Sequence, residues 1–239
     1  MKRSLLTLSL SFLTLSNAYA SEWGYNDDQH GPAHWGTFAQ DCSMTKNQSP
    51  INIEQSTQAT LEALNISYSG KVIGFTNNGH TLQAQVDGQN TLTIDGKTFE
   101  LQQFHFHTPS ENMIKNHQYP LEAHFVHAND DGELAVISVM FDEAQPNSAL
   151  TQLIRHIPEK GNTDFFSDGF KIRELLPESA HYYRFNGSLT TPPCSEGVRW
   201  FVLKDTQSLS KEQASKFMSV MGQNNRPLQP LNARVVLSN

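Results

Sequence analysis

The stretch Gln-Phe-His-Phe-His at residues 103–107 decides the fold, and Glu-Ala-His at residues 122–124 complements it farther along the chain. Successive side chains of a β-strand point to opposite faces, so the two histidines of the first stretch share one face. Its two phenylalanines then point to the other face, where aromatic rings suit a packed core. The histidine of the second stretch, on a neighbouring strand, would complete a set of three imidazoles.

Three imidazoles with a fourth position left open are typical of a catalytic zinc site rather than a structural one. The candidate ligands are His105, His107 and His124. Gln103 and Glu122 each precede a candidate ligand by two residues, so each lies on the same strand face as that ligand. An acceptor in this position takes the second ring N–H and fixes the tautomer. The alternative is that these are hydrogen-bonded core histidines and that both acceptors lie at a wet sheet edge.

Hydrophobic alternation predicts a predominantly β (α+β) fold in one domain, built on a mostly antiparallel sheet. Asp-Gly pairs at 87–88 and 95–96 are strong turn signals. Two helices are expected at the periphery, one over Ser148–Ile157 and one beginning at a capping box at Ser210 and ending at Gly222. Strands are expected at Leu64–Tyr68, Val72–Asn77, Thr81–Val86, Thr91–Ile94, Lys97–His107, Leu121–Ala128, Leu134–Phe141, Tyr182–Phe185 and Val198–Leu203.

The first twenty residues have the pattern of a secretory signal peptide. A basic start at Lys2 and Arg3 precedes an apolar run from Leu5 to Leu15, and Ala18-Tyr19-Ala20 is a small-x-small cleavage site. The run is too short for a permanent membrane span. We expect cleavage after Ala20, a single domain over residues 21–239 and export, with the periplasm favoured and full secretion as the alternative.

Composition excludes several partner classes. The chain carries 24 acidic against 17 basic residues, a formal net charge of −7 at pH 7. An acidic surface argues against nucleic acid and anionic membrane surfaces as partners, and no later segment is apolar enough to insert into a bilayer. The two cysteines, Cys42 and Cys194, predict one disulfide in an exported protein, with two free thiols as the alternative.

Six short motifs occur in order along nearly the whole chain from Trp23 to about Val236. They are Gln-Ser-Pro-Ile-Asn at 48–52, Asn-Gly-His at 78–80, Gln-Phe-His-Phe-His at 103–107, Glu-x-His-x-Val-His at 122–127, Ser-Leu-Thr-Thr-Pro-Pro at 188–193, and Asn-Arg-Pro at 225–227 with Gln-Pro at 229–230. Each is weak alone, but together they resemble the α-class carbonic anhydrases. The resemblance implies one domain around a large twisted sheet, with Zn²⁺ at the bottom of a conical cleft.

The resemblance also implies a reaction, the reversible hydration of carbon dioxide to bicarbonate and a proton by zinc-bound hydroxide. The three histidines would be the zinc ligands. Thr190 would accept a hydrogen bond from the hydroxide and donate one to Glu111, and the main-chain carbonyl of Asn224 would hold His107. His80 matches the position that shuttles the proton to solvent.

The remaining implied residues line the substrate site or tie the chain together. Thr191 would lie on the polar side of the cleft, and Cys42 and Cys194 match the disulfide of exported members. Two departures, Thr45 and Asn112, are expected to lie away from the metal ligands. The apolar wall for carbon dioxide would be Val126, Val136, Leu189, Val198 and Trp200.

Small molecules are the expected partners: carbon dioxide, bicarbonate and water, bound by a monomer or homodimer. Two rival functions use the same fold. A non-catalytic binding module commonly lacks a zinc-binding histidine, whereas all three are present here. A zinc hydrolase acting on esters would need the same three histidines, and the motifs do not exclude it as a side activity.

Overall fold

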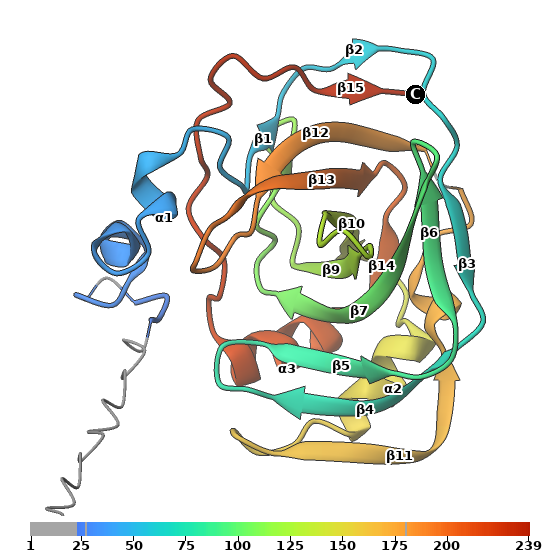
Figure 1. Ribbon diagram of the computed structural model, residues 1–239. Helices are drawn as coiled ribbons and strands as arrows, with labels where there is room; N and C mark the ends of the chain where they lie inside the picture. Colours follow the sequence, from blue (N-terminus) through green and yellow to red (C-terminus); the bar gives the residue numbers. More distant parts are fainter. Residues whose placement is uncertain (1–22, 27, 180) are drawn as a thin grey trace, which may run out of the picture.

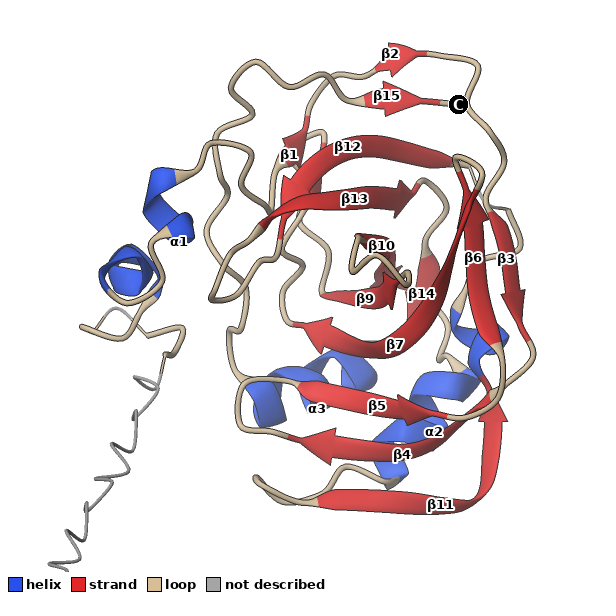
Figure 2. Cartoon of the chain, in the orientation of Figure 1, coloured by secondary structure: helices blue, strands red, loops and turns tan. Residues whose placement is uncertain are grey.

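The computed structural model describes residues 23–26, 28–179 and 181–239. The predicted signal peptide therefore lies outside the described residues. The structure is predominantly β (Figures 1 and 2). Its elements are η1 (Pro32–Thr37), α1 (Asp41–Met44), β1 (Asn52–Ile53), β2 (Thr57–Gln58), β3 (Asn65–Tyr68), β4 (Lys71–Asn77), β5 (Leu82–Val86), β6 (Asn90–Ile94), β7 (Lys97–His107), β8 (Met113–Ile114), β9 (Leu121–Ala128), β10 (Leu134–Glu143), α2 (Ser148–Arg155), β11 (Thr163–Lys171), η2 (Ile172–Leu175), β12 (Tyr182–Ser188), β13 (Glu196–Leu203), β14 (Gln207–Leu209), α3 (Lys211–Met221) and β15 (Leu237–Ser238), where η marks a 3₁₀ helix.

One large sheet dominates the described part of the chain. Its strands follow the order β11-β4-β5-β7-β9-β10-β13-β12-β15-β2, and β3, β6 and β14 pair alongside this path. Most neighbours are antiparallel, as predicted, while β10 pairs in parallel with β13 and β14, and β15 with β2. The ends of the path are β11 and β2, so β7, β9 and β10 lie at its centre (Figure 1).

The pairing of β7 with β9 sets the position of the histidines. In this register His105 faces His124, and Phe104 faces Phe125. Phe104 and Phe125 are fully buried and stack at 4.9 Å, while Phe106 packs on Phe217 of α3 at 5.1 Å. The alternation of the strand therefore places aromatic rings in the core on one face and imidazoles on the other, as the sequence predicts.

Helices α2 and α3 lie against the core face of the sheet (Figure 2). Asn147 caps α2 by accepting a hydrogen bond from Leu150 N at 3.1 Å. The predicted capping box of α3 is present, because Ser210 accepts from Gln213 N while the Gln213 side chain accepts from Ser210 N. The prediction for α2 was two residues too long, since the helix ends at Arg155.

The sequence pattern did not predict several of the strands and short helices. Strand β11 has a bulge between Phe165 and Phe170, which breaks the alternation that would reveal it. The strands β1, β2, β8 and β15 are two residues long, too short for any period. The N-terminal segment contains η1 and α1, which are too short to show a helical period. Among the described residues, no helix is both long and apolar enough to cross a membrane.

Candidate active site

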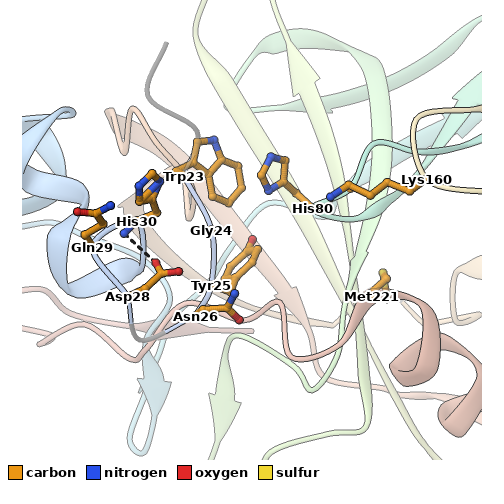
Figure 3. Close-up of a pocket in the computed structure, with 11 residues that line it drawn as sticks. Trp23, Gly24, Tyr25, Asn26, Asp28, Gln29, His30, His80, Lys160 and Met221 are labelled. Carbon is orange, nitrogen blue, oxygen red and sulfur yellow. Dashed lines mark hydrogen bonds between the residues drawn. The ribbon is translucent and has the colours of Figure 1, made fainter. Parts of the chain in front are cut away.

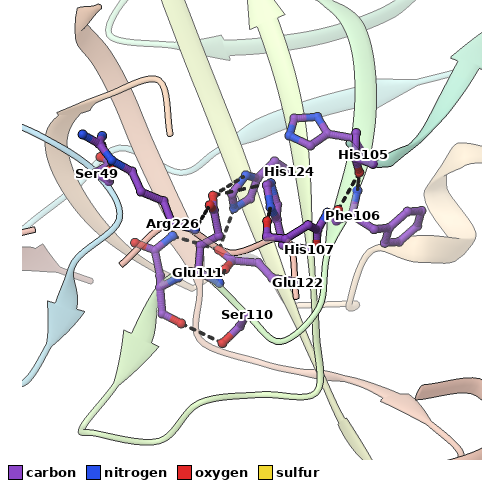
Figure 4. A network of polar contacts seen from close by, with 12 residues as sticks. Ser49, His105, Phe106, His107, Ser110, Glu111, Glu122, His124 and Arg226 are labelled. Atoms are coloured by element: carbon purple, nitrogen blue, oxygen red, sulfur yellow. Dashed lines mark hydrogen bonds and ion pairs between the residues drawn. The ribbon is translucent and has the colours of Figure 1, made fainter. Parts of the chain in front are cut away.

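Three histidines from the centre of the sheet meet at one point. One ligating atom from each of His105, His107 and His124 lies within 4.8 Å of the others. The other ring nitrogen of each lies close to an oxygen: Nδ1 of His105 lies 2.8 Å from Gln103 Oε1, and Nε2 of His124 lies 2.8 Å from Glu122 Oε1. Both acceptors are those that the sequence indicated. Figure 4 shows the three histidines together with Glu122.

The third acceptor comes from a distant part of the chain. Nδ1 of His107 lies 2.8 Å from the main-chain oxygen of Asn224. The carbonyl can only accept, so His107 carries its proton on Nδ1 and presents a lone pair at Nε2. That Nε2 atom is buried and has no hydrogen-bond partner among the described residues. Burial lowers the pKa of both His105 and His107, which favours the neutral imidazole that binds metals.

Glu122 is the most heavily bonded side chain at the site. Its Oε1 accepts from Ser138 Oγ at 2.6 Å and Asn112 Nδ2 at 2.8 Å, and its Oε2 accepts from the main-chain N of Glu111 at 2.7 Å and of Asn112 at 2.9 Å. Burial by itself would raise its pKa, but the charge of His124 and these hydrogen bonds outweigh burial and lower the pKa to about 2.

Ser138 and Asn112 also contribute to the site, although no sequence pattern indicated a role for either. Asn112 was expected to lie away from the metal ligands, yet it supplies two of the hydrogen bonds that hold Glu122, the acceptor for His124. Its side-chain oxygen also accepts from Ile51 N at 3.0 Å. The only signal in the sequence was its place directly after Glu111, which does not specify a contact across the sheet.

Glu111 lies beside the histidines, and no lysine or arginine side chain in the described part of the chain forms an ion pair with it. Its Oε2 is 3.4 Å from His107 Nε2 and 3.8 Å from His124 Nδ1. Its Oε1 accepts from Arg226 N at 2.8 Å, and the Thr190 hydroxyl also hydrogen-bonds the carboxylate. Burial raises the pKa of Glu111 to about 7, against the lowering effects of His124 and of these two hydrogen bonds.

The predicted wall residues gather next to the histidines. Val136, Val198 and Trp200 are buried in one apolar cluster, and Val126 and Leu189 pack against it. The Trp200 ring lies 4.9 Å from the His124 ring in an edge-to-face arrangement. Thr191 and His80 line a cavity of about 150 Å³ together with Gln103, His105 and His107. The structure thus has a polar side and an apolar side around the three histidines.

Comparison with known proteins gives one consistent result. The family of eukaryotic-type carbonic anhydrases matches residues 30–239. The chain belongs to the α-carbonic anhydrase family. A carbonic anhydrase of Pectobacterium carotovorum is 47% identical, with 97% of this chain and 96% of that protein aligned, and one of Neisseria gonorrhoeae is 41% identical, with 98% and 94% aligned. The Photobacterium profundum α-carbonic anhydrase structure is 58% identical with a TM-score of 0.89, covering 90% of this chain and all of that one.

Membership of the carbonic anhydrase family makes this chain an enzyme and gives it the family's reaction, the hydration of carbon dioxide. The prediction of an enzyme rather than a non-catalytic module is therefore confirmed. The fold prediction is confirmed by the same neighbours.

His80 lines both the cavity beside the histidines and a second pocket, called the outer pocket below. The outer pocket has a volume of about 480 Å³, and Lys160, Asp28 and His30 also line it (Figure 3). The Trp23 indole stacks on the His80 ring, with centroids 4.0 Å apart and planes 15° from parallel. His80 therefore faces both the inner cavity and the outer pocket.

The two cysteines form the predicted disulfide, Cys42–Cys194, which spans 152 residues of sequence. Cys194 N donates to Thr191 O at 2.8 Å, so the bridge anchors the loop that carries Thr190 and Thr191. His127, three residues after His124 in β9, lies on the opposite strand face and is buried there. Its Nε2 lies 2.6 Å from Tyr68 Oη and its Nδ1 3.1 Å from Ala135 O.

Proposed function

We propose that His105, His107 and His124 bind Zn²⁺ and that this chain hydrates carbon dioxide at that ion. The observation that carries the proposal is the arrangement of ring nitrogens. Gln103 and the carbonyl of Asn224 take Nδ1 of the first two rings, which leaves their Nε2 atoms for a metal. Glu122 takes Nε2 of His124, which leaves Nδ1. Three lone pairs from neutral rings then point at one place, the donor set that zinc prefers.

A zinc ion held by three neutral ligands keeps its full charge and, as a Lewis acid, lowers the pKa of a water molecule enough to supply a nucleophile at neutral pH. The side chains of this protein have the task of orienting that nucleophile, holding the substrate and removing a proton.

Thr190 and Glu111 orient the nucleophile. A hydroxyl has one proton, and in this proposal Thr190 donates its proton to the Glu111 carboxylate, in keeping with the hydrogen bond that lowers the pKa of Glu111. Toward the cavity Thr190 can then only accept a hydrogen bond. The nucleophile must donate its own proton to Thr190, which turns its lone pair toward the substrate.

The apolar wall holds the substrate. Carbon dioxide carries no net charge, so burial against Val136, Val198 and Trp200 costs it little and excludes competing water. Bicarbonate is charged and is poorly accommodated by the same wall, which favours its release. Val126 and Leu189 complete the wall, and Thr191 supplies a polar group on the other side.

His80 carries the proton to solvent. The ring nitrogens of the three ligand histidines are committed to the metal and to their acceptors, so they cannot relay it. His80 lines the same cavity as His105 and also the outer pocket. An ordinary histidine pKa, near 6.5, suits a relay at neutral pH.

The chain acts outside the cytoplasm in this proposal. Residues 1–20 serve as the signal peptide and residues 21–239 form the catalytic domain. The Cys42–Cys194 bridge supports an oxidising compartment, which we take to be the periplasm, with secretion as the alternative. The working form is a monomer or a homodimer.

Stopped-flow hydration of carbon dioxide by purified residues 21–239 tests the function. We expect about one zinc per chain, rapid hydration, and loss of both after dialysis against a chelator, with recovery on adding zinc. Ester hydrolysis measured on the same samples separates a carbonic anhydrase from an esterase. A zinc-loaded protein that cleaves esters but hydrates carbon dioxide no faster than buffer would overturn the proposal.

A further inference from the structure

The short segment over residues 224–226 contacts three parts of the proposed site. The carbonyl of Asn224 accepts from His107 Nδ1 at 2.8 Å, and the main-chain N of Arg226 donates to Glu111 Oε1 at 2.8 Å. The Asn224 amide also donates to the carbonyl of His80 at 3.0 Å. One turn of backbone therefore reaches a metal ligand, the carboxylate that orients Thr190 and the proton carrier.

All polar groups of Asn224 are used. Its main-chain N donates to Thr108 O at 3.1 Å, its Oδ1 accepts from Thr108 N at 2.7 Å, and its Nδ2 donates to Phe106 O as well as to His80 O, both at 3.0 Å. Phe106 and Thr108 flank His107, so the Asn224 side chain holds the backbone on both sides of this ligand. The residue is buried, with 1% of its surface exposed, which makes these bonds strong.

The side chain of Arg226 anchors this segment from the other side. Its Nη1 donates to Gln48 Oε1 at 2.7 Å and Ser49 O at 2.8 Å, and its Nη2 donates to Cys42 O at 3.2 Å. The guanidinium lies over the Trp35 ring at 5.6 Å. Arg226 is 3% exposed, and among the described residues no carboxylate forms an ion pair with its side chain.

A buried cation held only by neutral acceptors is costly, so its presence calls for a role beyond stability. The contacts of Gln48 show what that role is. Gln48 Oε1 accepts from Arg226, while Gln48 Nε2 donates to Cys194 O at 2.9 Å. Cys194 belongs to the loop that carries Thr190, and Thr190 hydrogen-bonds the same carboxylate, Glu111, that accepts from Arg226 N. These contacts link Arg226, through Gln48 and the loop of Cys194 and Thr190, back to the Glu111 carboxylate. Figure 4 shows Arg226 beside Glu111.

We propose that residues 224–226 are the positioning element of the site and that the Arg226 guanidinium is the anchor that fixes it. Arg226 touches no substrate and acts through two others, Glu111 and His107. The inference rests on the proposed function, because positioning matters only if these groups take part in hydration. A planar fork with several donors is needed to bind three acceptors at once, and a lysine cannot replace it.

The test compares Arg226→Met and Arg226→Lys with the parent. We expect both to bind zinc and to lose about 10- to 100-fold in kcat/KM, since small misplacements of reacting groups are costly. The Arg226→Lys variant should have a kcat/KM only slightly above that of Arg226→Met, because lysine keeps the positive charge but lacks the planar guanidinium group. Arg234→Met is the matched control, since that guanidinium also binds main-chain oxygens, those of Leu231, Asn186 and Pro230, away from the site.

A second readout does not depend on the activity of the zinc-loaded enzyme. The imidazole N–H proton of His107 that binds Asn224 O should give a protected downfield NMR resonance in the metal-free parent. We expect it to broaden or exchange faster in both Arg226 variants and to stay unchanged in Arg234→Met. Parent-like kcat/KM together with a parent-like His107 resonance would overturn the inference.

If Arg226→Met fails to fold, Arg226→Lys and Gln48→Met decide the question, since Gln48→Met removes one acceptor and leaves Ser49 O and Cys42 O in place. The two failures also remain distinguishable. An inactive parent refutes the proposed function, while the His107 resonance still reports whether Arg226 positions the segment.

Discussion

Two carboxylates on one β-hairpin reach the same pKa in opposite surroundings. Glu122 lies in β9, fully buried, and Glu133 lies in the turn before β10, with 31% of its side chain exposed. The pKa of each is lowered to about 2. For Glu133 the causes are hydrogen bonds from Lys97, from Arg199 and from Asn129, whereas for Glu122 the charge of His124 and neutral donors work against burial.

The different surroundings of Glu122 and Glu133 show that two carboxylates with the same pKa can have different roles. The bonds of Glu133 join partly exposed side chains at the surface, where water and salt screen them. The bonds of Glu122 lie in the interior beside three histidines, where each lost bond leaves a buried group unpaired. We therefore expect changes at the buried centre to affect the reaction strongly and changes at the surface group to affect stability weakly.

The largest effect is expected for His124→Ala, which removes one of the three proposed zinc ligands beside Glu122. Two histidines remain, so zinc content should fall well below one per chain and hydration should fall on the order of 10³-fold or more. Zinc analysis and stopped-flow hydration measure both. His117→Ala is the control, since 55% of that side chain is exposed. Full zinc occupancy and full rate in the His124 variant would refute the three-histidine assignment.

The Thr190→Ala variant should still bind zinc but should no longer orient the nucleophile. The hydroxyl that bonds Glu111 is lost, so kcat/KM should fall about 100-fold while zinc stays near one per chain. Thr98→Ala, at an exposed position, should match the parent. An unchanged kcat/KM in the Thr190 variant would show that the nucleophile is oriented by another group.

Removing the Cys42–Cys194 bridge should weaken the fold around the buried centre. The bridge closes a loop spanning 152 residues, and the chain-entropy model gives about 4–5 kcal/mol for such a loop as an upper value. A Cys42→Ala/Cys194→Ala double variant should unfold at lower denaturant concentration. Intact mass of exported protein isolated without reductant should be two hydrogens below the thiol form, and two free thiols would contradict the bridge.

His80→Ala should act on proton export alone. We expect kcat to fall about tenfold or more in dilute buffer, with kcat/KM for carbon dioxide nearly unchanged, because the attack on substrate precedes proton release. Added imidazole should restore part of the loss. A kcat that stays at the parent value in dilute buffer, or a loss that imidazole leaves in place, would assign the relay to another carrier.

The smallest effect is expected for Glu133→Gln at the surface. The folded pKa of about 2 lies below the ordinary value of 4.5, so the carboxylate adds stability above about pH 4.5 and loses it as pH falls toward 2. The variant should be slightly less stable than the parent at neutral pH and low salt, and equal to it near pH 2 or in high salt. Glu143→Gln serves as an exposed control. A large loss of stability that does not depend on salt would show that Glu133 is as important to the fold as a buried carboxylate such as Glu122.

Local pattern was enough for much of this protein. Alternation on Lys97–His107 placed phenylalanines and histidines on opposite faces, and the i−2 offsets of Gln103 and Glu122 located two acceptors, because both depend only on the two-residue period of a strand. The capping box of α3 is equally local. The order of the motifs indicated the carbonic anhydrase family, and the comparisons confirm this assignment.

Tertiary structure decided what no local period encodes. Asn112, from the loop between β7 and β8, and Ser138, from β10, both hydrogen-bond Glu122. Arg226 hydrogen-bonds Gln48, which lies 178 residues away in the sequence. Strand β11 pairs only at the sheet edge, and its bulge hides its alternation. A hydrogen bond between distant segments depends on register and on the path of the loops, which are set when the whole core packs, whereas a strand face is set by its own backbone.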